Sequence, residues 1–288
     1  LTQQQNITKK IAVFDLNNTI EEAEKFPYHN FPLNQIGGIH LNLVEFMTDI
    51  HPIRSVQEAQ AYIDRLNLFD DSFKGTLEIL DAQREAGIYP PKFVFDHVIR
   101  QLTEFLNYEK EANPLREVFV RKIKELELDA ETSQDLLVKL DFAIEDSVKP
   151  GFGLLLDFMY ETLPQANIHD GAWSLPNGDD FYALRLKVYT TTNYSAEDIH
   201  NIGLSEVQRL TGRMQEIFGQ LGYGDNLNVG EMMNELNTDP KFLYADTPDR
   251  KQVVVKDYTD IVEETWDAAE SSFHKMPESK VEVRAVPE

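Results

Sequence analysis

The chain contains no cysteine, and this absence excludes several kinds of chemistry at once. Without thiols the protein can form no disulfide framework, no thiolate nucleophile and no cysteine-ligated metal site. Basic residues are also scarce, with 27 Lys and Arg against 50 Asp and Glu, a formal net charge of −23. Nucleic acids and anionic membrane surfaces bind proteins through Lys and Arg. We therefore expect neither as a partner.

Long apolar runs are missing as well. No segment approaches the roughly 20 apolar residues of a membrane-spanning helix, and no signal peptide opens the chain, so we expect no membrane span. Residues 281–286 alternate between apolar and polar side chains, which predicts a short C-terminal β-strand just before the last residue, Glu288. Because Leu1 is not an initiator methionine, we expect the chain to be a fragment of a longer protein.

The apolar residues repeat mostly at intervals of three and four, the period of an amphipathic helix. With 288 residues, 42% of them hydrophobic, the chain is long enough to bury a large core. No internal repeat or low-complexity linker divides it. The sequence predicts a mainly α fold, a multi-helical array of antiparallel helices in a single α-rich unit over residues 1–288. Helices are predicted over residues 7–26, 56–66, 71–86, 91–108, 115–126, 130–148, 151–163, 179–189, 195–220, 229–236 and 258–274.

Residues 173–213 hold the densest run of helix signals and paired polar residues. A Pro-Asn-Gly sequence predicts a turn, and Asn177 or Asp179 can cap a helix that runs to Tyr189. Three β-branched residues then disfavour further helix, and a second helix follows. These residues are Thr190, Thr191 and Thr192. The pattern predicts a break between two helices.

The second of these helices carries charges on its apolar side. At 100° per residue, the stripe from Ile199 to Ile217 also contains Glu206 and Arg213. Residues seven apart share a helix face, so these two side chains are predicted to form an inward-facing structural ion pair. A role in lining a groove is the alternative. His200 lies at the margin of the same stripe.

Residues 27–43 are punctuated by prolines and paired glycines, which predicts an ordered loop. The loop either packs on the core through Phe31, Leu33 and Ile36 or lines a cleft. Its polar residues are the candidates for the second role. They are His29, Asn30, Asn34, Gln35 and His40.

No complete catalytic set can be read from the chain. Among the seven histidines only His274 has an acid four residues on, and Pro277 interrupts that pair. There is no glycine-rich phosphate loop and no G-x-S-x-G turn. Residues 11–19 resemble the nucleophile strand of haloacid-dehalogenase phosphatases, but Asn17 stands at the position of that family's general acid, and we predict a helix there. We name no catalytic residue and no metal ligand in this chain.

Several motifs together carry a family resemblance. They are W-x-L-P-N-G-x-x-x-Y from Trp173, Y-T-T-T from Tyr189 and H-x-x-G-L-x-E-V-x-R from His200, with further matching segments at 30–38, 51–52, 87–91 and 148–151. In this order they resemble the bacterial domain of unknown function 885 family, many members of which are predicted lipoproteins. The resemblance covers nearly the whole chain and corresponds to the N-terminal and central part of the family's sequences.

The resemblance implies a place in a metal-dependent peptidase. Members of this family look like distant relatives of helical zinc metallopeptidases, with a His-Glu-x-x-x-x-His-type metal helix in their C-terminal half. This chain would then be the non-metal half of a zincin-like peptidase fold, with a helical part at 1–150, a cleft-wall part at 151–288 and the metal-binding helix beyond residue 288. We expect zinc in the full-length protein, no cofactor in this chain and no hydrolase activity from this chain alone. The family's lipoproteins imply the cell envelope or periplasm.

Two functions follow. The first is the substrate-cleft half of a zinc-dependent metallopeptidase, whose partners are a peptide substrate and the missing C-terminal half of the same protein. The alternative is a non-catalytic helical binding or scaffolding module of the cell envelope. Under the first, the residues at the helix break bind substrate in a cleft bordered by the strand at 281–286. They are Tyr189, Thr190, Thr191, Thr192 and His200. Under the alternative, the threonines satisfy helix-end carbonyls.

Overall fold

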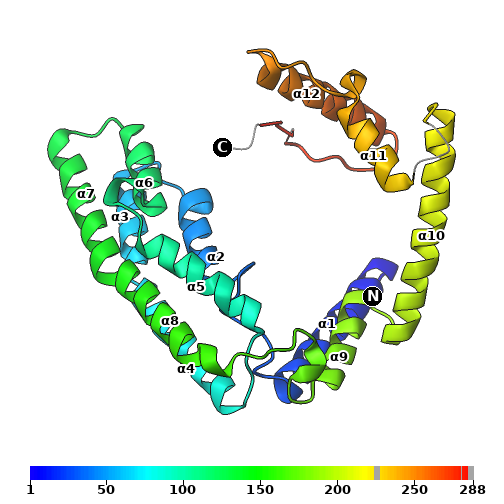
Figure 1. Ribbon diagram of the computed structural model, residues 1–288. Coiled ribbons are helices and arrows are strands. Elements are labelled where there is room, and N and C mark those ends of the chain that lie inside the picture. The colour runs from blue at the N-terminus through cyan, green and yellow to red at the C-terminus, as the bar shows by residue number, and fades with distance from the viewer. Residues whose placement is uncertain (224–227, 280, 285–288) are drawn as a thin grey trace. The chain divides into compact units, whose positions relative to one another are not determined.

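The computed structural model describes residues 1–223, 228–279 and 281–284, and nearly all of its regular structure is helical (Figure 1). The chain divides into two compact units, Leu1–Ala196 and Glu197–Glu288. The first unit contains α1 (Gln3–Lys25), α2 (Ile39–Glu45), α3 (Val56–Leu66), α4 (Phe69–Glu85), α5 (Lys92–Leu106), α6 (Pro114–Lys124), α7 (Ala130–Ala143), α8 (Lys149–Thr162) and α9 (Gly178–Thr190). The second is built from α10 (Ala196–Gln220), α11 (Val229–Thr238) and α12 (Arg250–Glu270).

Short helical turns of other kinds connect these elements. Two are π-helices, η1 (Phe46–Ile50) and η3 (Ile144–Val148), and the second joins α7 directly to α8. The 3₁₀ turns are η2 (Lys110–Ala112), η4 (Leu163–Gln165), η5 (Ala172–Ser174) and η6 (Pro240–Phe242). The mainly helical fold predicted from periodicity is therefore confirmed.

Local signals explain where the helices begin. The hydroxyl of Ser55 accepts from the backbone N–H of Glu58, so α3 starts where its cap predicts. Helix α6 begins at Pro114, a residue suited to the first helical position because the missing N–H would have no partner there. Helix α12 begins at Arg250 rather than at Tyr258, because the turn around Pro248 is followed at once by helix.

The predicted strand at 281–286 is wrong in its described part. Residues 281–284 adopt no regular structure, and residues 285 and 286 lie outside the described residues. A strand is held by hydrogen bonds to a neighbouring strand, and alternation of side chains does not supply that neighbour. The one β-type pairing in the described residues is an isolated parallel bridge between Pro91 and Asn167.

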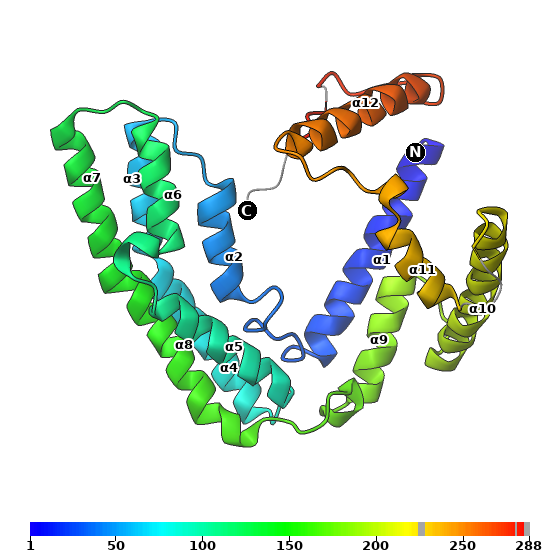
Figure 2. The same ribbon diagram turned by 45° about the horizontal axis from the view of Figure 1, so that its top comes forward.

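The core of the first unit lies among α3 to α8. In both views α4 and α5 lie along α8 (Figures 1 and 2), and α3 packs on α7. Aromatic rings fill the centre: Phe105 stacks on Phe152 with centroids 3.9 Å apart, and Phe73 meets Phe152 edge-on at 5.3 Å. Such pairs add about 0.5–1.5 kcal/mol each beyond the burial of their apolar area.

Helices α1 and α9 pack against each other in the first unit and lie side by side in both views (Figures 1 and 2). Their contact is tied by ion pairs from Arg185 to Glu22, at 3.0 Å, and from Lys187 to Glu21, at 3.4 Å. Residues 11–19 lie inside α1, so the helical prediction for this segment is confirmed and the phosphatase strand is excluded.

The second unit buries little through its own contacts. Of its described hydrophobic residues, Phe218 and Met232 are buried, whereas Val207, Leu210 and Tyr258 are exposed. Phe218 meets Tyr223 edge-on at 5.4 Å. None of the described helices combines the length and apolar character needed to cross a bilayer. The expectation of one α-rich unit with a subdivision at residue 150 stays a prediction.

Candidate ligand-binding site

The first unit contains a cavity of about 420 Å³ where the loop after α1 meets the segment that leads into α9. Its lining residues are His29, Asn30, Phe31, Asn34, Pro91, Asn167, Asp170, Gly171, Ala172, Ser174, Leu175 and Phe181. A cavity of this size is within the range of small-ligand sites. Two stretches that the sequence singled out separately, the 27–43 loop and the beginning of the 173–213 segment, therefore line one cavity.

The loop that forms one wall is ordered, as predicted. The buried side chain of Gln83 on α4 donates to the carbonyls of Tyr28 and Asn30, both at 2.7 Å. Asn34 closes the next turn, since its Oδ1 accepts from the N–H groups of Ile36 and Gly37. These bonds use backbone groups that would otherwise be unpaired, and they fix the wall against α4.

His29 joins this loop to the other wall. Its Nε2 lies 2.7 Å from the carbonyl oxygen of Pro176 and donates to it, because a carbonyl oxygen can only accept. The ring is buried between Phe26, edge-on at 5.2 Å, and Phe181, tilted at 4.8 Å. The remaining nitrogen, Nδ1, is buried and has no hydrogen-bond partner among the described residues. We assign His29 the role of holding the cavity's two walls together.

The turn into α9 has the geometry predicted for Pro-Asn-Gly but not the predicted cap. Asn177 is in the left-handed region, with φ 53°, and makes no side-chain capping bond. A capping residue normally has an extended backbone, so the left-handed conformation explains the missing bond. Gly178 packs directly on the carbonyl of Ala172, where a Cβ would overlap it. The glycine is therefore required by close approach of the backbone.

An exposed tryptophan, Trp173, lies in the chain between Ala172 and Ser174, two residues that line the cavity. The side chain of Trp173 is 62% exposed, and its indole lies over Gly171, where a Cβ would overlap the ring. The ring of His169 is tilted against it at 5.0 Å. Asn167 anchors the segment, since its Nδ2 donates to Ser174 Oγ at 2.7 Å. An aromatic surface thus stands beside the cavity without needing to be ordered by a ligand.

The electrostatic character of the cavity is simple. Among its lining residues Asp170 is the one with a formal charge at neutral pH, apart from any charge on His29, and no Lys or Arg is present. Asp170 is exposed and has no ion-pair partner among the described residues. The site therefore disfavours phosphate and carboxylate ligands and suits neutral or positively charged ones.

The predicted substrate-binding residues lie elsewhere. Tyr189, Thr190, Thr191 and Thr192 are at the far end of α9 from the cavity, and His200 is on α10 in the second unit. The predicted helix break is confirmed, because α9 ends at Thr190 and Thr191 is left-handed with φ 54°. Thr190 Oγ1 donates to the carbonyl of Leu186 at 2.7 Å, which satisfies a helix-end carbonyl. Tyr189 Oη accepts from Arg185 at 2.8 Å. Substrate binding by these residues stays a prediction.

The predicted pair between Glu206 and Arg213 is wrong in its partners. Glu206 pairs with Arg209 at 2.7 Å, and Arg213 pairs with Glu216 at 2.7 Å. All four side chains are exposed. Residues seven apart are separated by about 10.5 Å along a helix, whereas residues three apart are neighbours on its surface. Glu206 and Arg213 thus point in the same direction from α10 but are too far apart along the helix to form an ion pair.

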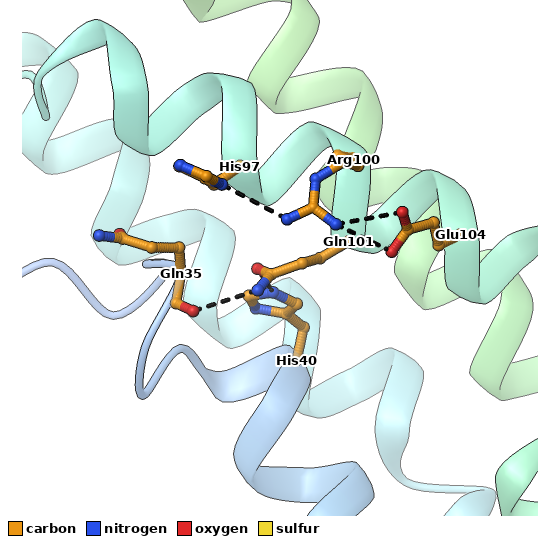
Figure 3. A network of polar contacts seen from close by, with 6 residues as sticks. All are labelled: Gln35, His40, His97, Arg100, Gln101 and Glu104. Atoms are coloured by element: carbon orange, nitrogen blue, oxygen red, sulfur yellow. Dashed lines mark hydrogen bonds and ion pairs between the residues drawn. The ribbon is translucent and has the colours of Figure 1, made fainter. Parts of the chain in front are cut away.

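A second cavity, of about 460 Å³, lies between α2, η1 and the end of α5. His40 borders it and is almost fully buried. Its Nε2 donates to Gln101 Oε1 at 3.0 Å, and Gln101 Nε2 donates to the carbonyl of Gln35 at 3.1 Å (Figure 3). Burial lowers the pKa of His40, so the ring is neutral at pH 7. These two hydrogen bonds hold α2 and the loop before it against α5.

Sequence reasoning missed several residues of the first cavity. Asn167, Asp170 and Ser174 were not singled out, although the run His169-Asp170-Gly171 before Trp173 is a turn signal that could have drawn attention to them. Among the described residues, no three His, Asp or Glu side chains cluster closely enough to hold a metal ion. Zinc in the full-length protein stays a prediction.

Comparisons with known proteins place the chain in a family. No curated protein matches it. Its structure is similar to the crystal structure of a predicted lipoprotein from Colwellia psychrerythraea, with a TM-score of 0.83 and 29% sequence identity. The match covers 88% of this chain and 43% of that one, so the chain spans less than half of its structural relative. The model of the bacterial proteins of unknown function DUF885 matches residues 1–288, and the chain belongs to that family.

Proposed function

We propose that this chain is the substrate-cleft half of a zinc-dependent metallopeptidase, whose metal-binding helix belongs to a part of the protein outside residues 1–288. The cavity at His29 is the observation that carries the proposal. It is lined from two segments that bear the family's motifs, and its rigid walls suit substrate contact rather than chemistry. Zinc and the group that activates water would come from the other half.

The length of the structural relative supports this division of roles. The chain corresponds to 43% of that protein, so a second half of comparable size exists there. We further propose that the protein acts in the cell envelope, as the description of that relative as a lipoprotein suggests. The partners would be a peptide and the remaining part of the same protein.

The test uses the full-length protein that contains this chain. We expect it to cleave a mixture of fluorogenic peptides, to lose activity when a chelator removes zinc and to recover it when zinc is restored. Tyr189→Phe and His200→Ala should each lower kcat/KM by on the order of tenfold if the helix break binds substrate, the loss of about one hydrogen bond. A zinc-loaded, folded protein that cleaves no peptide would contradict the proposal.

A non-catalytic binding or scaffolding module of the cell envelope is the second candidate. The hydrogen bond from Thr190 to Leu186 favours it, because that hydroxyl completes a helix end and is not left free for a substrate. Under this alternative the full-length protein would bind its partner without cleaving it. If the full-length protein does cleave peptides but Tyr189→Phe and His200→Ala leave kcat/KM unchanged, the helix break after α9 has a structural role and does not bind substrate.

A further inference from the structure

We propose that the cavity at His29, together with Trp173 next to its lining segment, binds a large apolar side chain of a peptide, preferably an aromatic one. The inference rests on the proposed function, because it names the substrate class of the same site.

The walls of the cavity are apolar where a side chain would enter. Phe31, Pro91, Leu175 and Phe181 contribute carbon surface. The volume, about 420 Å³, accommodates a large side chain with part of its backbone. Burying a phenylalanine side chain there would remove apolar surface from water, the main source of affinity in such sites.

Trp173 adds a surface that needs no ordering. The absence of a Cβ at Gly171 lets the indole lie against the backbone, and His169 contacts the ring at 5.0 Å. A side chain already fixed in its bound position loses little conformational freedom when a ligand arrives. Offset or edge-on contact with a second aromatic ring is the interaction such a surface favours.

The polar groups select the rest of the ligand. Asn30 Nδ2 donates to Glu22, whereas Asn30 Oδ1 has no partner among the described residues and can accept from a peptide N–H. With no Lys or Arg in the lining, a carboxylate or phosphate would find no counter-charge. The unpaired carboxylate of Asp170 favours a positive charge next to the apolar side chain. An uncharged or cationic peptide segment meets these conditions.

The chain offers its own reporter for binding. It contains two tryptophans, Trp173 and Trp266, and the second lies on α12 in the other unit. A Trp266→Phe background therefore leaves Trp173 as the sole indole. We would titrate this variant of the 288-residue chain with acetyl-Gly-Phe-Gly-amide and with acetyl-Gly-Ala-Gly-amide and follow tryptophan emission. We expect saturation with the phenylalanine peptide, and a Kd about tenfold or more lower than for the alanine peptide.

Two glycines supply a matched pair of variants. Gly171→Ala places a Cβ where the indole of Trp173 now lies. It causes no backbone strain, because the φ of residue 171 is −82°. We expect this variant to bind the phenylalanine peptide about fivefold more weakly. Gly153→Ala adds the same methyl group on α8 in open space and should leave the Kd unchanged. Equal affinity for the two peptides, no saturable change up to about 10 mM peptide, or parental binding by Gly171→Ala would each overturn the inference.

The two proposals fail separately. If this chain binds the phenylalanine peptide saturably but the zinc-loaded full-length protein cleaves no peptide, the peptidase proposal is contradicted and the binding site is supported. If the full-length protein cleaves Phe-containing and Ala-containing peptides equally well, the peptidase proposal is supported and the apolar binding site is contradicted.

Discussion

The two units of the chain carry similar amphipathic helices but use them differently. In the first unit the apolar faces of α4, α5 and α8 meet one another, and rings such as Phe73 and Phe152 are fully buried. In the second, the apolar stripe of α10 buries Phe218, while Val207 and Leu210 remain exposed. Most helical stability in proteins comes from packing of the apolar face rather than from propensity. Amphipathic spacing thus indicates a helix, and the presence of a partner decides whether its stripe is core.

The first unit also contains an ion pair that joins two helices. In the first unit Arg116 and Asp141, both mostly buried, join α6 to α7 at 2.8 Å. In the second unit the pairs on α10 and α12 join neighbours on one helix and are exposed. Exposed pairs of this kind contribute little to stability, because water and salt screen both charges. We therefore expect substitutions in the first unit to dominate stability.

The largest expected effect comes from a single methyl group at the contact of α4 and α8. A Cβ at Gly151 would lie 2.6 Å from Cδ2 of Phe73, a ring with no room to move. Gly151→Ala should therefore lower the free energy of unfolding by about 1–3 kcal/mol through overpacking. Gly153→Ala, two residues on and in open space, should be neutral or raise it by up to about 1 kcal/mol. Denaturant unfolding of both variants checks the pair, and equal effects would mean that α8 does not approach α4 this closely.

Helices of the first unit were largely predictable because their signals are local. Ser55 caps α3, Pro114 opens α6, and apolar residues at three and four spacing fill both. Burial was less predictable, since nothing in the sequence distinguishes the partnered stripe of α5 from the exposed stripe of α10. The predicted strand is absent from residues 281–284 for a related reason: alternating side chains indicate the two faces of a strand but do not supply a neighbouring strand.

The second prediction concerns pH and two of the three buried histidines of the first unit, His40 and His51. Burial lowers the pKa of His40, and burial together with the guanidinium of Arg65 lowers that of His51. His51 Nε2 accepts from Arg65 at 2.9 Å; Lys122 and Glu58 also face it. The unfolded chain gains these protons near pH 6.5, and the folded chain only at lower pH. Stability should therefore be complete above about pH 6.5 and fall as the pH drops below it.

Denaturant unfolding between pH 7.5 and 5.5 measures this loss. His51→Gln should reduce the slope of stability against pH, because it removes one of the two rings whose pKa is lowered in the folded chain. A flat profile over this range would show that neither buried ring resists protonation.

The smallest expected effect is that of Glu206→Ala. Its partner Arg209 is 62% exposed and remains hydrated when the carboxylate is removed, so the free energy of unfolding should stay unchanged within the error of the measurement. Arg116→Ala is the matched contrast in the first unit, because it leaves the mostly buried Asp141 with one ion-pair partner fewer. If Glu206→Ala destabilised the chain as much as Arg116→Ala, the exposed position of Glu206 would be contradicted and an inward-facing pair supported.

The candidate site was predictable only in its parts. The loop with His29 and the turn at Asn177 were recognised from proline and glycine spacing, but their meeting depends on a bond between residues 147 positions apart, from His29 to Pro176. Local signals carry no information about such a contact. Tyr189 Oη accepts from Arg185 and Thr190 Oγ1 donates to Leu186, both within α9, and such local bonds depend on the conformation at the helix end, which the residue types alone do not specify.

Hydrogen exchange of the intact chain tests the contrast between the units most directly. Amides protected by packing exchange only through global unfolding, whereas those in poorly buried helices exchange through local opening. We predict that amides in α4, α5 and α8 exchange slowest and share one free energy of opening, while amides in α10 and α12 exchange orders of magnitude faster. If α10 and α12 were protected to the same level as α8, the claim that the first unit holds the stability of the chain would be contradicted.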